Sequence, residues 1–255
     1  MELPALDMLL FLVVTGFVAA FIDSIVGGGG LISVPALLFT GLPPNLVLGT
    51  NKLGGTMSSL TSTISFLFSG KIDRKLGMRL FPLSFLGAIG GTYLVHLVPP
   101  EFMKPLVVIL LAAVLIYTLL KKNWGGSASF AGLTGWRATA LAAGALALGF
   151  YDGFFGPGTG SFIIFMFLFF GFDFVGASAN AKVLNFGSNL ASLGTFIALG
   201  SVNWYYGLPM GIAMIGGALV GSQLAVRKGT AYVKPLFIIV TTILIGKQLW
   251  GVLAG

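Results

Sequence analysis

The sequence contains no cysteine and only one histidine, His96, among its 255 residues. Without cysteine, thiolate catalysis, thiol redox chemistry and cysteine-based metal sites are excluded. Charge is also scarce, because Asp, Glu, Lys and Arg make up 8% of the chain, whereas a soluble domain carries about 25%. So few charges cannot cover a folded surface with groups that water solvates. We therefore do not expect a soluble protein.

Apolar residues dominate instead, at 56% of the chain with a mean hydropathy of +1.01. Most of the apolar segments are near the length of about 20 residues at which a helix crosses roughly 30 Å of hydrocarbon. The sequence therefore predicts an all-α membrane protein, a polytopic helical bundle. The ten segments cover residues 5–22, 31–41, 46–69, 77–97, 103–121, 137–152, 159–171, 177–199, 205–226 and 232–253.

Two of these segments, residues 31–41 and 159–171, are too short to span a bilayer as helices. The first would be about 16 Å long at 1.5 Å per residue. Each follows a glycine-rich break, at residues 27–30 and 156–160. The pattern predicts a short broken helix after each break, and it leaves open whether these helices cross the membrane or re-enter it.

The two halves of the chain repeat each other. Asp23 pairs with Asp152 at an offset of 129 residues, and after the glycine-rich break the offset is 130. One fixed offset over more than eighty residues indicates a duplication. The pairs include Gly41 with Gly171, Lys52 with Lys182, Ser58 with Ser188, Gly70 with Gly200, Gly87 with Gly217 and Gly91 with Gly221.

The distribution of basic residues predicts that the halves are inverted. Residues 71–79 contain four Lys or Arg, whereas their counterpart at 201–203 contains none. The next loop reverses the bias, because three basic residues lie within 227–234 and only Lys104, opposed by Glu101, in the first half. Since basic loops stay in the cytoplasm, corresponding loops face opposite sides. Inverted repeats are typical of secondary transporters.

This topology predicts a first repeat over residues 1–122, a cytoplasmic loop over 123–136 and a second repeat over 137–255. Each half has an odd number of crossings, so both termini are expected outside, on the periplasmic side of a cell inner membrane.

Four charged residues lie deep in the predicted segments at repeat-related positions: Asp23, Lys52, Asp152 and Lys182. A charge within a membrane segment costs at least about 2.5–3.5 kcal/mol on insertion scales, so it usually marks a pathway or an ion pair. We expect the lysines to attract a substrate and the aspartates to relay protons or pair with the lysines. Ion pairs that only hold the repeats together are the alternative.

The glycine-rich breaks predict an anion site. Two breaks inverted about the midplane place two helix N-termini, with unpaired N–H groups and positive dipole ends, at one central position. That geometry suits an anion. The expected binding residues are Gly28, Gly29, Gly30, Gly158 and Thr159. Glycines that only allow helices to cross closely are the alternative.

Small and amide side chains accompany the buried lysines. Thr50 and Asn51 directly precede the first lysine, and Asn185 and Asn189 follow the second, Lys182. The spacing in the second half places Lys182 and both amides on one helical face. We expect all of them to bind the substrate, with simple hydrogen bonding between helices as the alternative.

No motif indicates an enzyme, a cofactor or a metal centre. The sequence has no Gly-Lys-Ser/Thr after a glycine-rich loop, no cluster of His and Glu and no Gly-x-Ser-x-Gly turn. The net charge of +7 resides mostly in loops, which predicts the positive-inside bias and no binding to nucleic acid or nucleotides.

The motif at residues 21–30, Phe-Ile-Asp-Ser-Ile-Val followed by four glycines, and Gly-Thr-Asn-Lys at 49–52 resemble the sulfite exporter TauE/SafE family. The second half has related runs at 149–160 and 181–185, where Pro157 and Thr159 interrupt the glycines, so the two half-sites need not bind equally. The resemblance covers nearly the whole chain. It implies a transporter of the bacterial cytoplasmic membrane for sulfur-containing anions such as sulfite or organosulfonates, with export as the best-known direction.

The sequence therefore predicts a secondary transporter that binds a small inorganic or organosulfur anion at the midplane, between the repeats. Coupling to protons and electrically driven export both stay open. The expected partners are the anion and the lipid bilayer, and a homodimer is left open. A membrane scaffold without transport activity, or a cation or metal carrier using Asp23 and Asp152, is the alternative function.

Overall fold

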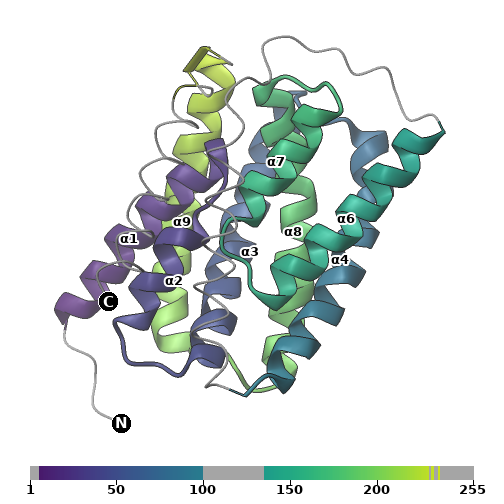
Figure 1. The fold of residues 1–255 in the computed structure, drawn as a ribbon. Helices are drawn as coiled ribbons and strands as arrows, with labels where there is room; N and C mark the ends of the chain where they lie inside the picture. Colours follow the sequence, from purple (N-terminus) through teal and green to yellow (C-terminus); the bar gives the residue numbers. More distant parts are fainter. Residues whose placement is uncertain (1–5, 100–134, 230, 233–234, 236–255) are drawn as a thin grey trace, which may run out of the picture.

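A computed structural model describes residues 6–99, 135–229, 231, 232 and 235. Within these residues the chain forms eight α-helices, four in each half (Figure 1). The first half contains α1 (Leu6–Val26), α2 (Gly30–Leu38), α3 (Pro44–Phe68) and α4 (Arg74–Leu97). The second half contains α6 (Trp136–Phe154), α7 (Thr159–Phe169), α8 (Phe174–Ala198) and α9 (Trp204–Lys228). The all-α class is thus confirmed for the described part of the chain.

Each of these helices corresponds to a predicted segment. The predicted segment 103–121, nearly all of 232–253 and most of the predicted loop at 123–136 lie outside the described residues. Helix ends differ from the predicted segments by a few residues; in particular, the segments predicted to end at residues 22 and 152 continue as α1 to Val26 and as α6 to Phe154. A helix can continue through Asp23 and Asp152 because both carboxylates have partners inside the bundle.

Three of the long helices begin at a polar cap. The side chains of Asp73, Asp173 and Asn203 accept hydrogen bonds from the first turns of α4, α8 and α9. Each cap satisfies an N–H group that has no partner within its helix. The loops before these three helices are thereby held at defined residues, which sets where each helix enters the bundle.

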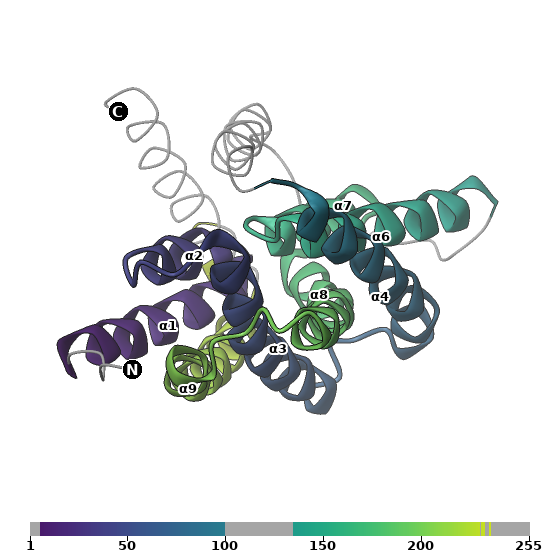
Figure 2. The ribbon, with the colours of Figure 1, turned by 90° about the horizontal axis from the view of Figure 1, so that it is seen from below.

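The helices pack in pairs that join the two halves. Helix α1 packs along α9, and α6 packs along α4, while α3 and α8 contact each other near the centre (Figure 2). Exchanging the halves converts the first pair into the second. Glycines allow the close approach: a Cβ at Gly91 would overlap the carbonyl of Phe150 on α6, and one at Gly217 would overlap that of Phe17 on α1.

The two short helices turn back at the glycine-rich breaks. In Figure 1, α2 returns toward the end of the bundle at which α1 begins, and α7 returns toward the end at which α6 begins. With nine residues, α2 is about 14 Å long at 1.5 Å per residue. The α1–α2 and α6–α7 pairs are therefore helical hairpins, which open toward opposite ends of the molecule.

Polarity separates the outer helices from the central ones. Helices α1, α4 and α9 are long and apolar enough to cross a membrane, and they expose large apolar side chains such as Leu10, Leu86 and Ile212. Helices α3 and α8 have 25 residues each but bury many hydroxyl, amide and ammonium groups. These polar side chains face the inside of the bundle, where they can find partners or line a cavity.

Candidate functional site

Both glycine-rich breaks contain residues with left-handed backbone. Gly27 and Gly28 have φ of 76° and 84°, and Gly156 and Gly158 have φ of 95° and 86°. Only glycine adopts this conformation without a steric penalty. Helix α2 then begins at Gly30 and α7 at Thr159, so the predicted short helices after each break are present.

The two breaks touch each other at the centre of the molecule. A Cβ at Gly27 would overlap the backbone of Gly160 and Ser161, and one at Gly30 would lie 3.0 Å from Pro157 Cα. In addition, Ser161 Oγ donates a hydrogen bond to the carbonyl oxygen of Val26 at 3.1 Å. The N-termini of α2 and α7 therefore meet, although they come from different halves of the chain.

Several N–H groups at this meeting point have no partner. Those of Gly28, Gly30, Gly158 and Gly160 donate no hydrogen bond to another residue in the described ranges. By contrast, the N–H of Gly29 donates to Asp23 Oδ1 at 3.0 Å. Free donors at a helix start carry the positive end of the helix dipole and bind anions readily.

The four deep charges form two ion pairs, each of which joins the halves. Lys52 Nζ on α3 lies 2.9 Å from Asp152 Oδ1 on α6. Lys182 Nζ on α8 lies 2.5 Å from Asp23 Oδ2 on α1. Exchange of the two halves converts one pair into the other. Sequence reasoning left open whether the aspartates pair with the lysines, and the structure contains both pairings.

The two carboxylates differ in their further partners. Asp152 Oδ2 accepts a hydrogen bond from Ser188 Oγ on α8 at 2.6 Å, and the Asp152 side chain is 3% exposed. The second oxygen of Asp23 instead accepts from the N–H of Gly29, and the Asp23 side chain is 16% exposed. Asp152 is thus held between α3 and α8, whereas Asp23 is held between α8 and the start of α2.

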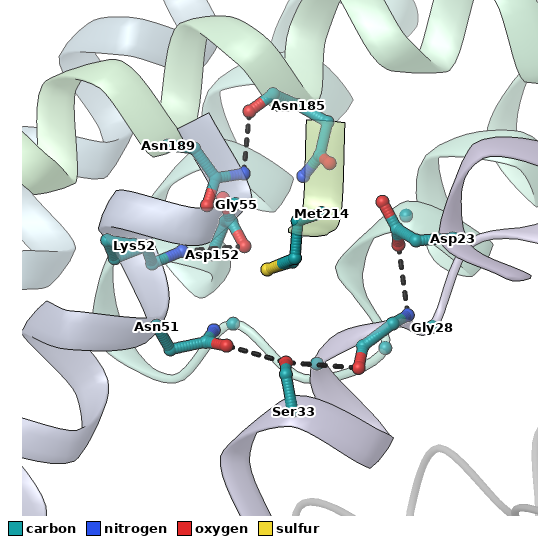
Figure 3. A pocket seen from close by; sticks show the side chains of 15 residues that line it. Asp23, Gly28, Ser33, Asn51, Lys52, Gly55, Asp152, Asn185, Asn189 and Met214 are labelled. Carbon is teal, nitrogen blue, oxygen red and sulfur yellow. Dashed lines mark hydrogen bonds and ion pairs between the residues drawn. The ribbon is translucent and has the colours of Figure 1, made fainter. Parts of the chain in front are cut away.

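A cavity of about 30 Å³ lies beside these groups (Figure 3). It has room for about one or two water molecules. Both halves contribute to its wall, and most of the wall is polar or glycine. The lining residues are Asp23, Gly28, Gly29, Gly30, Ser33, Asn51, Lys52, Gly55, Asp152, Gly156, Gly158, Gly160, Asn185, Asn189 and Met214.

Three predicted binding residues do not line this cavity. Lys182 is fully buried and reaches the cavity wall only through Asp23, which binds its ammonium. Thr50 Oγ1 accepts a hydrogen bond from the N–H of Asn203 at 2.9 Å, and Thr159 Oγ1 donates to the carbonyl oxygen of Gly156 at 2.7 Å. The expectation that both lysines face the shared cavity is therefore corrected: only Lys52 does.

Other predicted residues lie together as the spacing required. Asn185 and Asn189 both line the cavity, and Asn189 Nδ2 donates to the carbonyl oxygen of Asn185 at 2.8 Å. Asn51 lines it from α3. Its Oδ1 accepts a hydrogen bond from Ser33 Oγ at 2.6 Å (Figure 3). The amide nitrogen of Asn51 donates no hydrogen bond to another described residue and is therefore available as a donor.

Sequence reasoning missed five lining residues: Ser33, Gly55, Gly156, Gly160 and Met214. The repeat offset could have indicated Gly55, because Gly55 is the counterpart of Asn185 at 130 residues. A Cβ at Gly55 would lie 2.6 Å from Asn189 Oδ1, so glycine leaves room for that amide. No signal in the sequence distinguishes Met214 from the other apolar residues of α9.

Comparison with known proteins gives one consistent result. The sequence model of the sulfite exporter TauE/SafE family matches residues 12–247. A probable membrane transporter protein of a Sinorhizobium species, ORF9, is 42% identical over 93% of this chain and 90% of its own length. A probable membrane transporter protein of Haemophilus influenzae is 37% identical over 96% of both chains. The probable membrane transporter protein YfcA of Escherichia coli is 36% identical over 97% of this chain and 91% of its own length. No solved structure gives a significant match.

Proposed function

The chain belongs to the sulfite exporter TauE/SafE family of membrane transporters, and we propose that it is a secondary transporter that moves a small anion through the cavity between its two halves. The expected cargo is sulfite or an organosulfonate, because the family model carries the name of a sulfite exporter. Export across the cell inner membrane is the expected direction.

The observation that carries this proposal is the chemistry of the cavity wall. Free N–H groups at two helix starts converge there with the ammonium of Lys52 and the amide of Asn51. An oxyanion that leaves water needs donors in place of its hydration shell. The wall offers such donors from both halves, so an anion bound there would contact both parts that have to move during transport.

An anion that binds in the cavity has to compete with the aspartates for the ammonium groups of the lysines. Lys52 is neutralised by Asp152 and Lys182 by Asp23, so the four groups together carry no net charge. Protonation of Asp152 would remove the partner of Lys52 and leave its ammonium for the anion. Binding of the anion and of a proton would then favour each other, because such coupling is reciprocal. This provides a route to proton-coupled transport.

The size of the cavity bears on the cargo. At about 30 Å³, the cavity has room for about one or two water molecules, and an anion of four or more heavy atoms needs a wider one. We therefore infer that the site widens when one of the ion pairs or one of the glycine-rich breaks moves. Sulfite is smaller than an organosulfonate, so the cavity has to widen less to hold it. Sulfite is therefore the first anion to test.

Packing and charge support two inverted halves with both termini outside. The pairs α1–α9 and α6–α4 exchange with the halves, as do the two ion pairs. In Figure 1 the start of α4, the start of α6 and the end of α9 lie at one end of the bundle. All three carry basic residues, as expected of a cytoplasmic face. The α1–α2 and α6–α7 hairpins then re-enter the membrane from opposite sides.

The proposal is tested by loading proteoliposomes with sulfite and measuring efflux with and without a pH gradient. Proteoliposomes with the wild-type protein are expected to release sulfite faster than sulfite-loaded liposomes without protein. Lys52→Gln is expected to lower the rate at least about tenfold, since it removes a charged donor from the site. Lys71→Gln, which changes an exposed loop lysine, is the matched control and should leave the rate unchanged.

Two outcomes would contradict the proposal. If no anion in a panel of sulfite, sulfate, sulfonates and carboxylates moves under any gradient, a scaffold explains the chain better. If a cation moves instead, and Asp152→Asn abolishes this flux while Lys52→Gln does not, the carrier transports cations. Melting temperatures of each variant in detergent separate these results from misfolding.

A further inference from the structure

The ion pairs of the two halves are related by exchange, but the hydrogen bonds of their carboxylates are not. Ser188 lies six residues after Lys182 on α8, and its hydroxyl donates to Asp152. Its counterpart, Ser58, lies six residues after Lys52 on α3. Ser58 Oγ is buried and has no hydrogen-bond partner among the residues that the structure describes. By the symmetry of the pairs, its partner would be Asp23.

The expected partner of Ser58 is engaged elsewhere. Asp23 uses one oxygen for Lys182 and the other for the N–H of Gly29 at the start of α2. Asp152 instead uses its oxygens for Lys52 and Ser188, one on each central helix. The first half is thus in one arrangement and the second half in another, and a buried hydroxyl without a partner costs free energy.

We propose that Ser58 is a switch residue: in the second conformation of the transport cycle, the Asp23 carboxylate leaves the N–H of Gly29 and accepts a hydrogen bond from Ser58, while Asp152 leaves Ser188. The second conformation is then the described one with the roles of the halves exchanged. The inference rests on the proposed function, because a transporter opens its site to one side of the membrane and then to the other. The described conformation is assigned to one of these states and the exchanged conformation to the other.

The exchange requires no new chemistry in the site. Both ion pairs persist, and Asp23 exchanges the N–H of Gly29 for the hydroxyl of Ser58. Asp152 exchanges the hydroxyl of Ser188 for the free N–H of Gly158 at the start of α7. The number of hydrogen bonds to the two carboxylates is therefore unchanged. The carboxylate that lies between α3 and α8 is the less exposed one in the described conformation, at 3% against 16%. In the second conformation, Asp23 becomes the less exposed carboxylate. Access to the cavity therefore passes from one half of the site to the other.

Ser58→Ala and Ser188→Ala test the proposal because they should have opposite effects. Ser188→Ala removes a hydrogen bond of the described conformation, whereas Ser58→Ala removes one that forms only in the second. Each lost bond to a carboxylate is expected to shift the equilibrium between the two conformations about tenfold. The readout is the labelling of a single cysteine, Met214→Cys in the cavity wall, by a membrane-impermeant maleimide added to either side of the membrane.

The natural sequence contains no cysteine, so labelling reports this position alone. The expected result is that the ratio of labelling from the two sides rises in one serine variant and falls in the other. Ser62→Ala and Ser192→Ala are matched controls, because Ser62 and Ser192 are repeat counterparts that are also buried without a partner among the described residues. Neither Ser62 nor its counterpart Ser192 bonds to a carboxylate in the described structure, so exchange of the halves gives neither of them a carboxylate partner. Both variants should leave the ratio of labelling from the two sides unchanged.

The switch is refuted if Ser58→Ala behaves like Ser62→Ala, or if the Ser58 and Ser188 variants shift the ratio in the same direction. This readout needs no substrate. If the wild-type protein moves sulfite and Ser58→Ala leaves the labelling ratio unchanged, only the switch is contradicted. Protein with opposite labelling shifts but no anion flux contradicts the proposed function while leaving the exchange of conformations in place.

Discussion

At the scale of single residues, the buried charges are the feature that most needs an explanation. Lys52 and Asp152 have side chains that are 2% and 3% exposed. Removing two charges from water costs several kcal/mol per ion, and the attraction between them often does no more than offset this cost. A pair of apolar residues would hold α3 and α6 together at least as well. This supports a role of the pair in transport beyond packing.

The first prediction separates the stability of this pair from its function. Lys52→Gln alone leaves the carboxylate of Asp152 buried without its cation, which is expected to destabilise the protein by about 3–5 kcal/mol. The double variant Lys52→Gln/Asp152→Asn removes both charges and should recover most of that loss. Chemical denaturation in detergent micelles measures the free energies.

The double variant should remain inactive in sulfite efflux even though its stability is recovered, because the site has lost its ammonium. Recovery of transport together with stability would mean that the pair only supports the fold. The same comparison with Lys182→Gln/Asp23→Asn tests whether the lysine that does not line the cavity is also needed.

The sequence indicated these residues through their depth and their repeat relation, but not their partners. Asp23 is 29 residues from Lys52 along the chain, yet it pairs with Lys182, 159 residues away. Only the packing of α1 against the second half brings them together. The same packing places the carboxylate of Asp23 between the ammonium of Lys182 and the cavity. For this reason Lys182 does not line the cavity, although the sequence predicted that it would.

At the scale of secondary structure, the glycine-rich breaks bring two helix N-termini into contact. The breaks and the short helices after them were predictable, because runs of glycine interrupt apolar segments and eleven residues are too few to span a bilayer. The direction of the short helices was not, since a helix of this length has the same composition whether it continues or turns back.

The second prediction compares two glycines with nearly the same backbone conformation. Gly27 has φ of 76° and lies against the backbone of α7, whereas Gly41 has φ of 77° and no atom lies within 4 Å of a Cβ there. Gly41→Ala is expected to cost about 1 kcal/mol from backbone strain alone. Gly27→Ala adds an overlap with Gly160 and Ser161 and should force the two helix starts apart.

Efflux from proteoliposomes and thermal melting measure the two effects. Gly41→Ala should transport sulfite at close to the wild-type rate, and Gly27→Ala should lose transport and melt at a lower temperature. Equal behaviour of the two variants would show that contact between the breaks is not required.

At the scale of the whole molecule, the proposed inversion of the halves decides what each side of the membrane contains. Counterpart positions in the two halves should lie on opposite sides. Arg74 and Trp204, the first residues of α4 and α9, are such counterparts at an offset of 130, and both are exposed.

The third prediction is that single cysteines at these two positions are labelled from opposite sides. A membrane-impermeant maleimide added to intact cells should modify Trp204→Cys and should modify Arg74→Cys only after the cytoplasmic face is opened. Lys75→Cys and Tyr205→Cys form a second matched pair. Labelling of both members of a pair from the same side would rule out inverted halves.

The sequence alone determined the class of protein, the positions of the breaks and the identity of the four deep charges, and it predicts a duplication. All of these depend on composition, spacing and segment length, which are properties of the chain itself. Tertiary structure decided which lysine meets which aspartate, which residues surround the cavity and how small that cavity is. These features depend on contacts between helices that lie far apart in the chain, such as Asp23 with Lys182 at 159 residues and Lys52 with Asp152 at 100 residues. No local pattern encodes such contacts.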